Sequence, residues 1–352
     1  MPPHALIVND DGPPSATSPY VLDLYQKLVA RGWNVRVVLP SSQKSWSGTN
    51  YSVTSSRVRY WYYYPLRDNF LGTHPDTHLC WSHVRRKINT ERGEIGEWVL
   101  VDGVPSTCTN IGLYTGEALL GGDAGPIDLV LSGPNFGRNT GTAFSISSGT
   151  LGGALSGSLC DVRSIAISFC HFMQDPPTLD KSRASGPALA PDAFDAMARL
   201  ACEHTARLCE KLYDAWDTDT NVESYSINVP IAETLTQPSV YWTRIWSSRH
   251  EQLYPLPSDR DNEERVKPLG IDPKEPVDED PACSYLAFRP NLSRAMCPSD
   301  PQPGTDAWAI HHGYISISRL VARFEHVEPG TRPPPQLCLL YTSDAADDSL
   351  RV

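Results

Sequence analysis

The sequence predicts an α/β fold with a mainly parallel, Rossmann-like sheet and helices on both of its faces. Three observations predict this fold. Short, continuously apolar runs recur along the chain, segments with apolar residues at helical spacing lie between them, and polar or small residues follow several of the runs. A strand buried on both faces is continuously apolar, and such strands alternating with helices are typical of a parallel sheet.

Strands are expected at five apolar runs, the first of which lies close to Met1. These runs are Ala5–Val8, Val35–Leu39, Ile127–Leu131, Ser164–Phe169 and Tyr225–Val229. A later β-rich arm is expected near Trp242–Phe288.

Helices are expected in the segments between these strands. In the first, apolar residues recur at helical spacing from Val21 to Val29, with Thr17 or Ser18 as the cap and Gly32 at the end. Two further helices are expected to begin near Gly149–Thr150 and to span Phe194–Leu212.

One domain is expected over residues 1–329, followed by a proline-rich linker and a tail over 330–352. Three polar or proline-rich segments, near 67–96, 173–191 and 255–303, are expected to be irregular surface inserts.

The composition argues against several classes of protein. A net charge of −11 does not suit a general nucleic-acid binder, which needs a basic face. The nine cysteines are scattered, form no CxxC pair and are odd in number, so neither a zinc site nor a disulfide framework is indicated. No signal peptide or membrane-spanning segment is evident, and the expected location is the cytoplasm.

Two adjacent carboxylates, Asp10 and Asp11, directly follow the first expected strand. Open α/β sheets bind ligands at the carboxyl ends of their strands. Neighbouring carboxylates repel each other, and a hard divalent cation would offset that repulsion. The alternative is a turn whose side chains bond the local backbone, and the tetrapeptide alone does not decide between the two.

Neutral oxygen donors follow two other expected strands. Ser45 and Ser47 lie in the segment after the second strand, and Asn135 lies after the third. Further along, Ser148, Gly149 and Thr150 open a helix, where backbone N–H groups and hydroxyls form a natural phosphate cradle. A plain helix cap is the alternative for either hydroxyl. Together these residues predict one metal ion beside a phosphate pocket.

This set resembles the survival-protein SurE family of metal-dependent nucleotidases and acid phosphatases. The resemblance extends to about Glu328, apart from the inserts. It rests on Val8–Gly12, Lys44–Gly48, Leu131–Gly137, Ser148–Thr150, Ile227–Pro230, Thr305–Trp308 and His312–Ile317.

The resemblance implies a role for each motif residue. The metal, one Mg²⁺ or Mn²⁺ per subunit, would be held by Asp10, Asp11, Ser45 and Asn135, and the phosphate by Asn139, Ser148, Gly149 and Thr150. Asp10 and Asp11 would also be catalytic, by orienting or deprotonating the attacking water. Counting residues from Pro40 favours Ser45 as the ligand, whereas counting back from Thr54 favours Ser47.

Three positions depart from the family pattern. Thr107 replaces a usual aspartate, Ser147 a usual tyrosine and Ser156 a usual acid. The resemblance implies hydrolysis of nucleoside monophosphates (5′- or 3′-nucleotidase or acid phosphatase) in a homodimer or homotetramer that exchanges its arms. The alternatives are a haloacid-dehalogenase-like phosphatase that forms an aspartyl-phosphate on Asp10, and a catalytically weak nucleotide-binding module of a regulatory chain.

Overall fold

The computed structural model describes residues 3–51, 57–121, 125–171, 191–216, 221–255 and 301–325, together with 286, 288, 290–292 and 294–295. The chain divides into a unit over 1–322 and a second unit over 323–352, of which residues 323–325 are described. The predicted linker and tail therefore lie outside the described residues, and the domain boundary at 329 stays a prediction.

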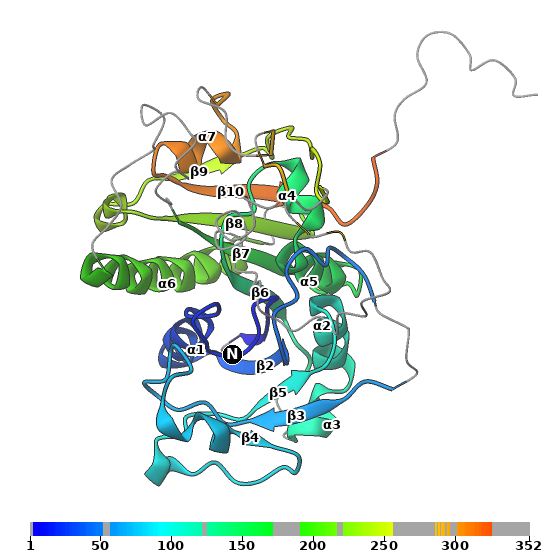
Figure 1. Cartoon of the computed structure of the whole chain (residues 1–352), viewed down its shortest axis with the longest axis vertical. Helices are drawn as coiled ribbons and strands as arrows, with labels where there is room; N and C mark the ends of the chain where they lie inside the picture. Colours follow the sequence, from blue (N-terminus) through cyan, green and yellow to red (C-terminus); the bar gives the residue numbers. More distant parts are fainter. Residues whose placement is uncertain are drawn as a thin grey trace, which may run out of the picture. The chain divides into compact units, whose positions relative to one another are not determined.

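The described residues form a ten-stranded sheet in the order β4-β3-β5-β2-β1-β6-β7-β8-β10-β9 (Figure 1). The strands are β1 (His4–Val8), β2 (Asn34–Pro40), β3 (Tyr60–Tyr63), β4 (Trp81–Ser82), β5 (Trp98–Val101), β6 (Leu129–Phe136), β7 (Ser164–His171), β8 (Ser224–Ile231), β9 (Val240–Thr243) and β10 (Ile315–Leu320). The pairs β3–β4, β3–β5 and β8–β10 are antiparallel and all other pairs are parallel, which confirms the mainly parallel sheet.

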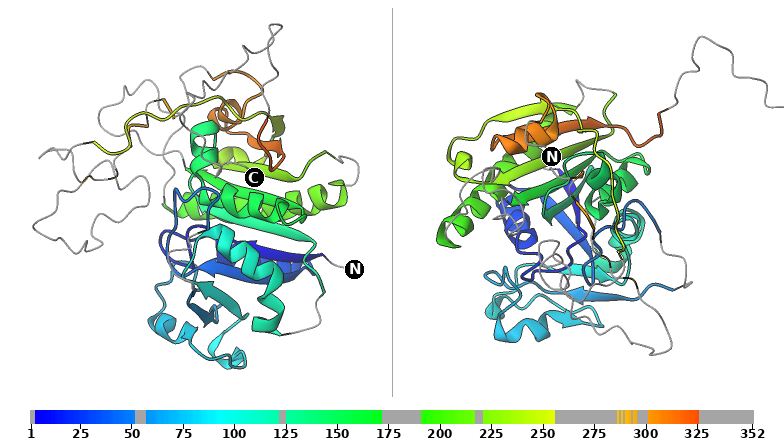
Figure 2. Two further views of the ribbon diagram at one scale, coloured as in Figure 1. Left: turned by 90° about the vertical axis from the view of Figure 1, so that its right-hand side faces the viewer. Right: turned by 45° about the horizontal axis from the view of Figure 1, so that its top comes forward.

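Helices cover both faces of the sheet, as predicted. They are α1 (Val21–Ala30), α2 (Pro105–Tyr114), α3 (Gly116–Leu120), α4 (Thr142–Ser147), α5 (Gly149–Ser158), α6 (Pro191–Asp214) and α7 (Asp306–His311). Figure 1 shows α1 and α6 on one face and α2 and α5 on the other, and the left view of Figure 2 shows α2 and α5 in front of the strands. None of the described helices is long and apolar enough to cross a membrane.

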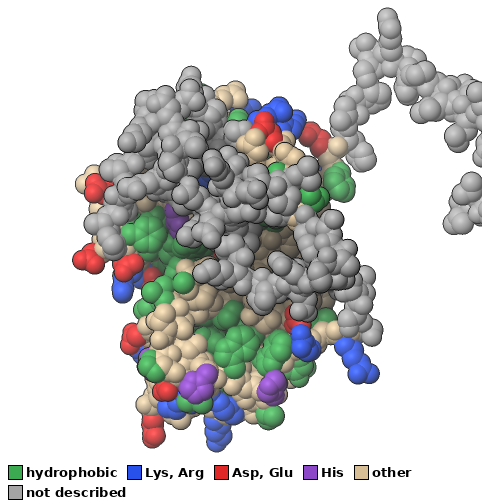
Figure 3. All heavy atoms as spheres, in the orientation of Figure 1, with side chains coloured by type: hydrophobic (Ala, Val, Ile, Leu, Met, Phe, Trp, Pro, Cys, Tyr) green, Lys and Arg blue, Asp and Glu red, His purple; other side chains and the backbone are tan. Residues whose placement is uncertain are grey.

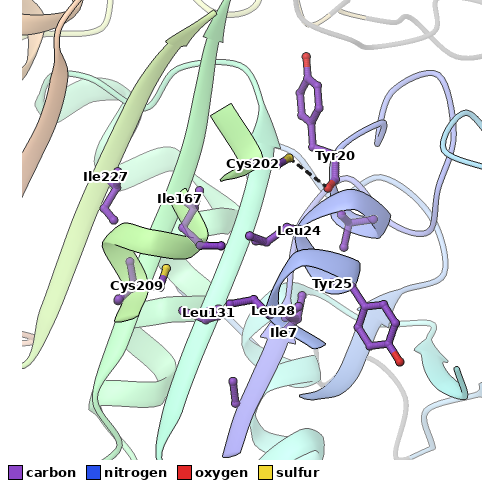
Figure 4. Packing of buried hydrophobic residues seen from close by; sticks show 14 of the residues in the cluster. Ile7, Tyr20, Leu24, Tyr25, Leu28, Leu131, Ile167, Cys202, Cys209 and Ile227 are labelled. Atoms are coloured by element: carbon purple, nitrogen blue, oxygen red, sulfur yellow. Dashed lines mark hydrogen bonds between the residues drawn. The ribbon is translucent and has the colours of Figure 1, made fainter. Parts of the chain in front are cut away.

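The core is split by the sheet because successive strand residues point to opposite faces. Ile7 packs with Leu131 and with the residues of α1 and α6 (Figure 4), whereas Leu6 and Val8 pack on the face that α2 covers. The side chains of Leu6, Ile7, Val8 and Leu131 are fully buried, and each contributes about 1.5–3 kcal/mol to stability. Cys202 and Cys209, which lie on α6, are both fully buried.

Two predicted boundaries were wrong, each for a local reason. Helix α1 begins at Val21, and neither Thr17 nor Ser18 caps it, because the Ser18 hydroxyl donates to the Gly12 carbonyl at 2.8 Å instead. The strand expected to end at Leu131 continues to Phe136 as β6, so Asn135 lies within the strand and not after it. The pairing of β6 with β7 shifts register between Ser132 and Asn135.

The insert near 67–96 is described and mostly irregular, with β4 and two short 3₁₀ turns, η1 (Pro75–Cys80) and η2 (Thr90–Arg92). Figure 3 shows histidine side chains at the surface in the region of β3 and β4, where His74, His78 and His83 are exposed. Of the expected β-rich arm, β9 is an edge strand of the main sheet and residues 256–285 lie outside the described residues. The insert near 173–191 also lies almost wholly outside them.

Candidate active site

The candidate site lies where three neighbouring parallel strands end. Strand β1 is paired with β2 on one side and β6 on the other, so the segments that follow β1 and β2 lie beside the bulged end of β6. From β1 the sheet grows toward β2 in one direction and toward β6 in the other. This end of β1 is therefore a topological switch point, where open α/β sheets bind ligands.

The turn after β1 is closed by Asn9 and presents the two aspartates. The Asn9 amide donates to the Gly12 carbonyl at 2.8 Å, and its Oδ1 accepts from the Gly12 N–H at 3.0 Å. Gly12 has φ +85°, in the left-handed region that glycine adopts without strain. The alternative, a turn whose side chains bond the local backbone, therefore applies to Asn9. It does not apply to Asp10 and Asp11, whose side chains bind Thr150 and Phe136, far away in the sequence.

Asp10 and Asp11 are both buried, with 3% of each residue exposed. Asp10 Oδ1 accepts from the Thr150 hydroxyl at 2.6 Å, and Asp11 Oδ2 accepts from the Phe136 N–H at 2.6 Å. Burial raises the pKa of Asp10 to about 6. Burial, and then the charge of Asp10, raise the pKa of Asp11 well above its ordinary value. Two buried carboxylates side by side are the arrangement that a divalent cation stabilises.

The hydroxyl of Ser47 lies next to this pair. Its Oγ is buried and makes no hydrogen bond among the described residues. A β-carbon on Gly149 would lie 2.6 Å from Ser47 Oγ and 3.0 Å from Asp10 Oδ2, so only glycine fits there and the two oxygens face the same small space. Because a buried, unpartnered hydroxyl is costly, a ligand to it is expected. This geometry favours Ser47 over Ser45, and the assignment of either stays a prediction.

The donor set fits a magnesium-like ion. The Asn135 amide nitrogen donates to the Gly137 carbonyl at 2.9 Å, which leaves its Oδ1 as the atom that could bind a cation. Among the described residues no group of three or more His, Cys, Asp or Glu side chains lies together. Two carboxylates completed by neutral oxygens and water suit Mg²⁺, which retains much of its hydration, better than they suit zinc.

The four predicted phosphate residues have different surroundings. Ser148 caps α5 by accepting from the Leu151 N–H at 3.1 Å, so its own proton remains for a ligand oxygen. The Thr150 hydroxyl already donates to Asp10, and Asn139 Nδ2 donates to the Ser168 hydroxyl at 2.8 Å. In this structure Ser148 and Gly149 lie at the start of the helix, whereas Thr150 and Asn139 hold other residues in place.

Sequence reasoning missed the partners that hold these residues. Ser168 on β7 and Asn228 on β8 bind the side chain and the N–H of Asn139, the latter at 3.0 Å. The signal was available, since each is a buried polar residue with an apolar residue on either side of it in its strand. Burial of a polar group requires a hydrogen-bond partner, so both positions indicated long-range contacts.

His171 and Tyr20 form a second unforeseen pair, behind Phe136. The Tyr20 hydroxyl and His171 Nε2 are 2.7 Å apart, and the His171 ring lies 4.2 Å from that of Phe136. Burial lowers the pKa of His171 from 6.5 to about 4. The pair therefore supports the residue whose N–H binds Asp11.

This pKa gives a stability prediction. The unfolded chain gains a proton on His171 as the pH falls below about 6.5, but the folded protein does not until about pH 4. Protonation of His171 in the unfolded chain therefore lowers the free energy of unfolding by up to about 3 kcal/mol between these two pH values. We expect His171→Gln, which cannot titrate, to flatten the decline in unfolding free energy, measured in urea at pH 7 and near pH 4. His78→Gln, at an exposed position, is the control. An unchanged pH slope in His171→Gln would contradict the prediction.

Comparison with known proteins gives consistent results. Residues 5–252 match the family described as survival protein SurE. A Dehalococcoides mccartyi (strain CBDB1) protein named 5′-nucleotidase SurE is 30% identical over 322 residues, covering 90% of this chain and 88% of that protein. A Fervidobacterium nodosum protein of the same name is 33% identical over 318 residues, covering 89% of each.

A yeast protein and a solved structure are also similar to this chain, but each supports a more limited conclusion. A Saccharomyces cerevisiae protein named probable tubulin–tyrosine ligase PBY1 is 34% identical over 255 residues, covering 69% of this chain. The chain spans 31% of the length of that yeast protein. The crystal structure of SurE protein from Aquifex aeolicus has a TM-score of 0.54 at 20% identity, covering 92% of this chain and 95% of that one, and supports the fold.

Proposed function

Because the chain belongs to the survival protein SurE family, we propose that it is a metal-dependent phosphomonoesterase that releases phosphate from nucleoside monophosphates. The observation that carries this proposal is the buried pair of carboxylates, Asp10 and Asp11, beside the start of α5. The relatives named as 5′-nucleotidases extend over about nine tenths of the chain, which supports the same substrate class. The ligase name of the yeast relative is not carried over, because the match covers 31% of that protein.

The proposed metal site uses Asp10, Asp11, Asn135 and a serine hydroxyl, from Ser45 or Ser47. A bound Mg²⁺ or Mn²⁺ would supply positive charge that polarises a phosphoryl oxygen. The phosphate would bind at the first turn of α5, where the Ser148 hydroxyl and the positive end of the helix dipole favour negative charge. One of the two aspartates would orient the attacking water and take its proton.

The surroundings of Asp10 and Asp11 suit their proposed roles in binding the metal and activating the water. Thr150 and the Phe136 N–H each bind one oxygen of a carboxylate, so both carboxylates are held in fixed orientations. A fixed, partly dehydrated carboxylate loses little free energy to reorganisation when charge develops beside it. A homodimer or homotetramer and a cytoplasmic location remain part of the proposal.

The function is tested by measuring phosphate release from nucleoside 5′- and 3′-monophosphates and from p-nitrophenyl phosphate, with EDTA, Mg²⁺ or Mn²⁺ present. We expect turnover with either metal and almost none in EDTA, because two uncompensated buried carboxylates repel an anionic substrate. Full activity in EDTA would contradict the metal site. Trapping a phosphorylated Asp10 would instead support the haloacid-dehalogenase-like mechanism.

A further inference from the structure

A segment that follows β9 is tied to the helix next to the phosphate site. Residues 244–250 run beside α4, where the Trp246 carbonyl accepts from the Thr142 N–H at 2.8 Å and the Ser248 hydroxyl accepts from the Ala143 N–H at 2.9 Å. Both oxygens of the buried Asp306 carboxylate add to this, accepting from the Gly141 and Trp246 N–H groups at 2.8 Å each. The segment is therefore held at several points along the first turn of α4.

The last residue of this segment, His250, reaches the other end of α4. Its Nε2 lies 3.0 Å from the hydroxyl of Ser147, the residue directly before Ser148. The His250 ring also lies 5.7 Å from that of Trp46, which stands between the two candidate serine ligands. His250 is exposed, so it can exchange protons with solvent.

The proposed reaction has a requirement that Asp10 and Asp11 do not meet. Asp10 and Asp11 can take a proton from the attacking water, but an alkoxide leaving from a nucleoside must receive one. Histidine is the side chain best suited to transferring protons near neutral pH. Serine can pass a proton on, because its hydroxyl accepts one hydrogen bond while donating another.

We propose that His250 and Ser147 form a proton relay to the leaving-group oxygen of the substrate, an inference that rests on the proposed function. As the water oxygen bonds to phosphorus, the ester P–O bond breaks and its electron pair stays on the leaving oxygen. Ser147 donates its proton to that oxygen and receives one from His250 Nε2. The products are the nucleoside and phosphate, the proton of the water goes to an aspartate, and His250 is protonated again by solvent.

The test compares two leaving groups in four proteins: wild type, His250→Gln, Ser147→Ala and the double variant. A nucleoside 5′-monophosphate releases an alkoxide that needs a proton, whereas p-nitrophenyl phosphate releases a phenolate that is stable without one. We expect each single variant to lose about 100-fold in kcat on the nucleotide and far less on p-nitrophenyl phosphate. The double variant should lose no more than either single one, because the two residues act as a unit. Ser247→Ala, in the same segment, is the control.

The other possible outcomes also decide whether His250 and Ser147 form a proton relay. Equal loss on both substrates, or losses that multiply in the double variant, would overturn the relay and leave the proposed function standing. Wild-type protein without activity on either substrate would overturn both. In His250→Ala, added imidazole should restore nucleotide turnover in proportion to its concentration, because the site is open to solvent. Failure of imidazole to restore any turnover would count against proton transfer by His250.

Discussion

Replacing Asp10 with asparagine should lower nucleotide turnover on the order of 1,000-fold, since an electrostatic contribution of several kcal/mol is lost from the transition state. The fold should survive, because asparagine keeps the oxygen that accepts from Thr150 and removes a buried charge. We therefore expect an unfolding temperature in EDTA that is equal to or above that of wild type. The stabilisation that Mg²⁺ gives to the wild-type protein should be absent, since it reflects binding to the folded state.

The control is Asp102→Asn, which removes a carboxylate whose partner is the exposed Arg59. Its turnover and its response to Mg²⁺ should match wild type. The same metal titration, applied to Ser45→Ala and Ser47→Ala, identifies the hydroxyl ligand as the one whose loss raises the Mg²⁺ requirement more. A folded Asp10→Asn protein that keeps its turnover, or keeps the Mg²⁺-dependent rise in unfolding temperature, would rule out the proposed site.

Much of the fold could be predicted because the central strands are buried on both faces. In β1 the residues Leu6 and Ile7 point to opposite faces yet both are fully buried, so the run is apolar throughout. Helix α2 could not be predicted in the same way. The residues it buries include Ser106, Thr109 and Gly112, which pack closely and give no apolar stripe. Its hydrophobic periodicity is therefore too weak to identify a helix.

The candidate site could be located but not assembled from sequence. Parallel strands bring their carboxyl ends to one edge, so Asp10 and Asn135 were expected near each other before any contact was known. The orientation of each side chain depends instead on distant partners. Thr150 is 140 residues from the Asp10 that it binds, and Asn139 is 29 residues from Ser168. Local patterns carry no information about which of several available acceptors a hydroxyl or an amide meets in the folded protein.

Replacing Gly152 with alanine should destabilise the protein by about 1–3 kcal/mol and reduce turnover, an effect of overpacking. A β-carbon at this position of α5 would lie 2.1 Å from the Gly48 carbonyl oxygen and 2.6 Å from its carbon. Both atoms belong to the backbone, so no rotation of a side chain relieves the contact. The segment that carries Ser45 and Ser47 would have to move away from α5.

The neighbouring Gly153→Ala is the matched control. The three nearest atoms to its β-carbon would all belong to side chains: the Ser132 hydroxyl at 2.7 Å, a Val8 methyl group at 3.1 Å and the Pro105 β-carbon at 3.3 Å. The hydroxyl can rotate away. Alanine also favours the helix over glycine by about 1 kcal/mol at either position, which offsets part of each cost. Urea unfolding of both variants should therefore show the larger loss of stability in Gly152→Ala, and metal titration should show a raised Mg²⁺ requirement in that variant alone. If the two variants behave alike, helix packing in general, rather than the contact with Gly48, positions the serine segment. A raised Mg²⁺ requirement confined to Gly152→Ala would mean that this close backbone contact sets the distance between the serine segment and Asp10.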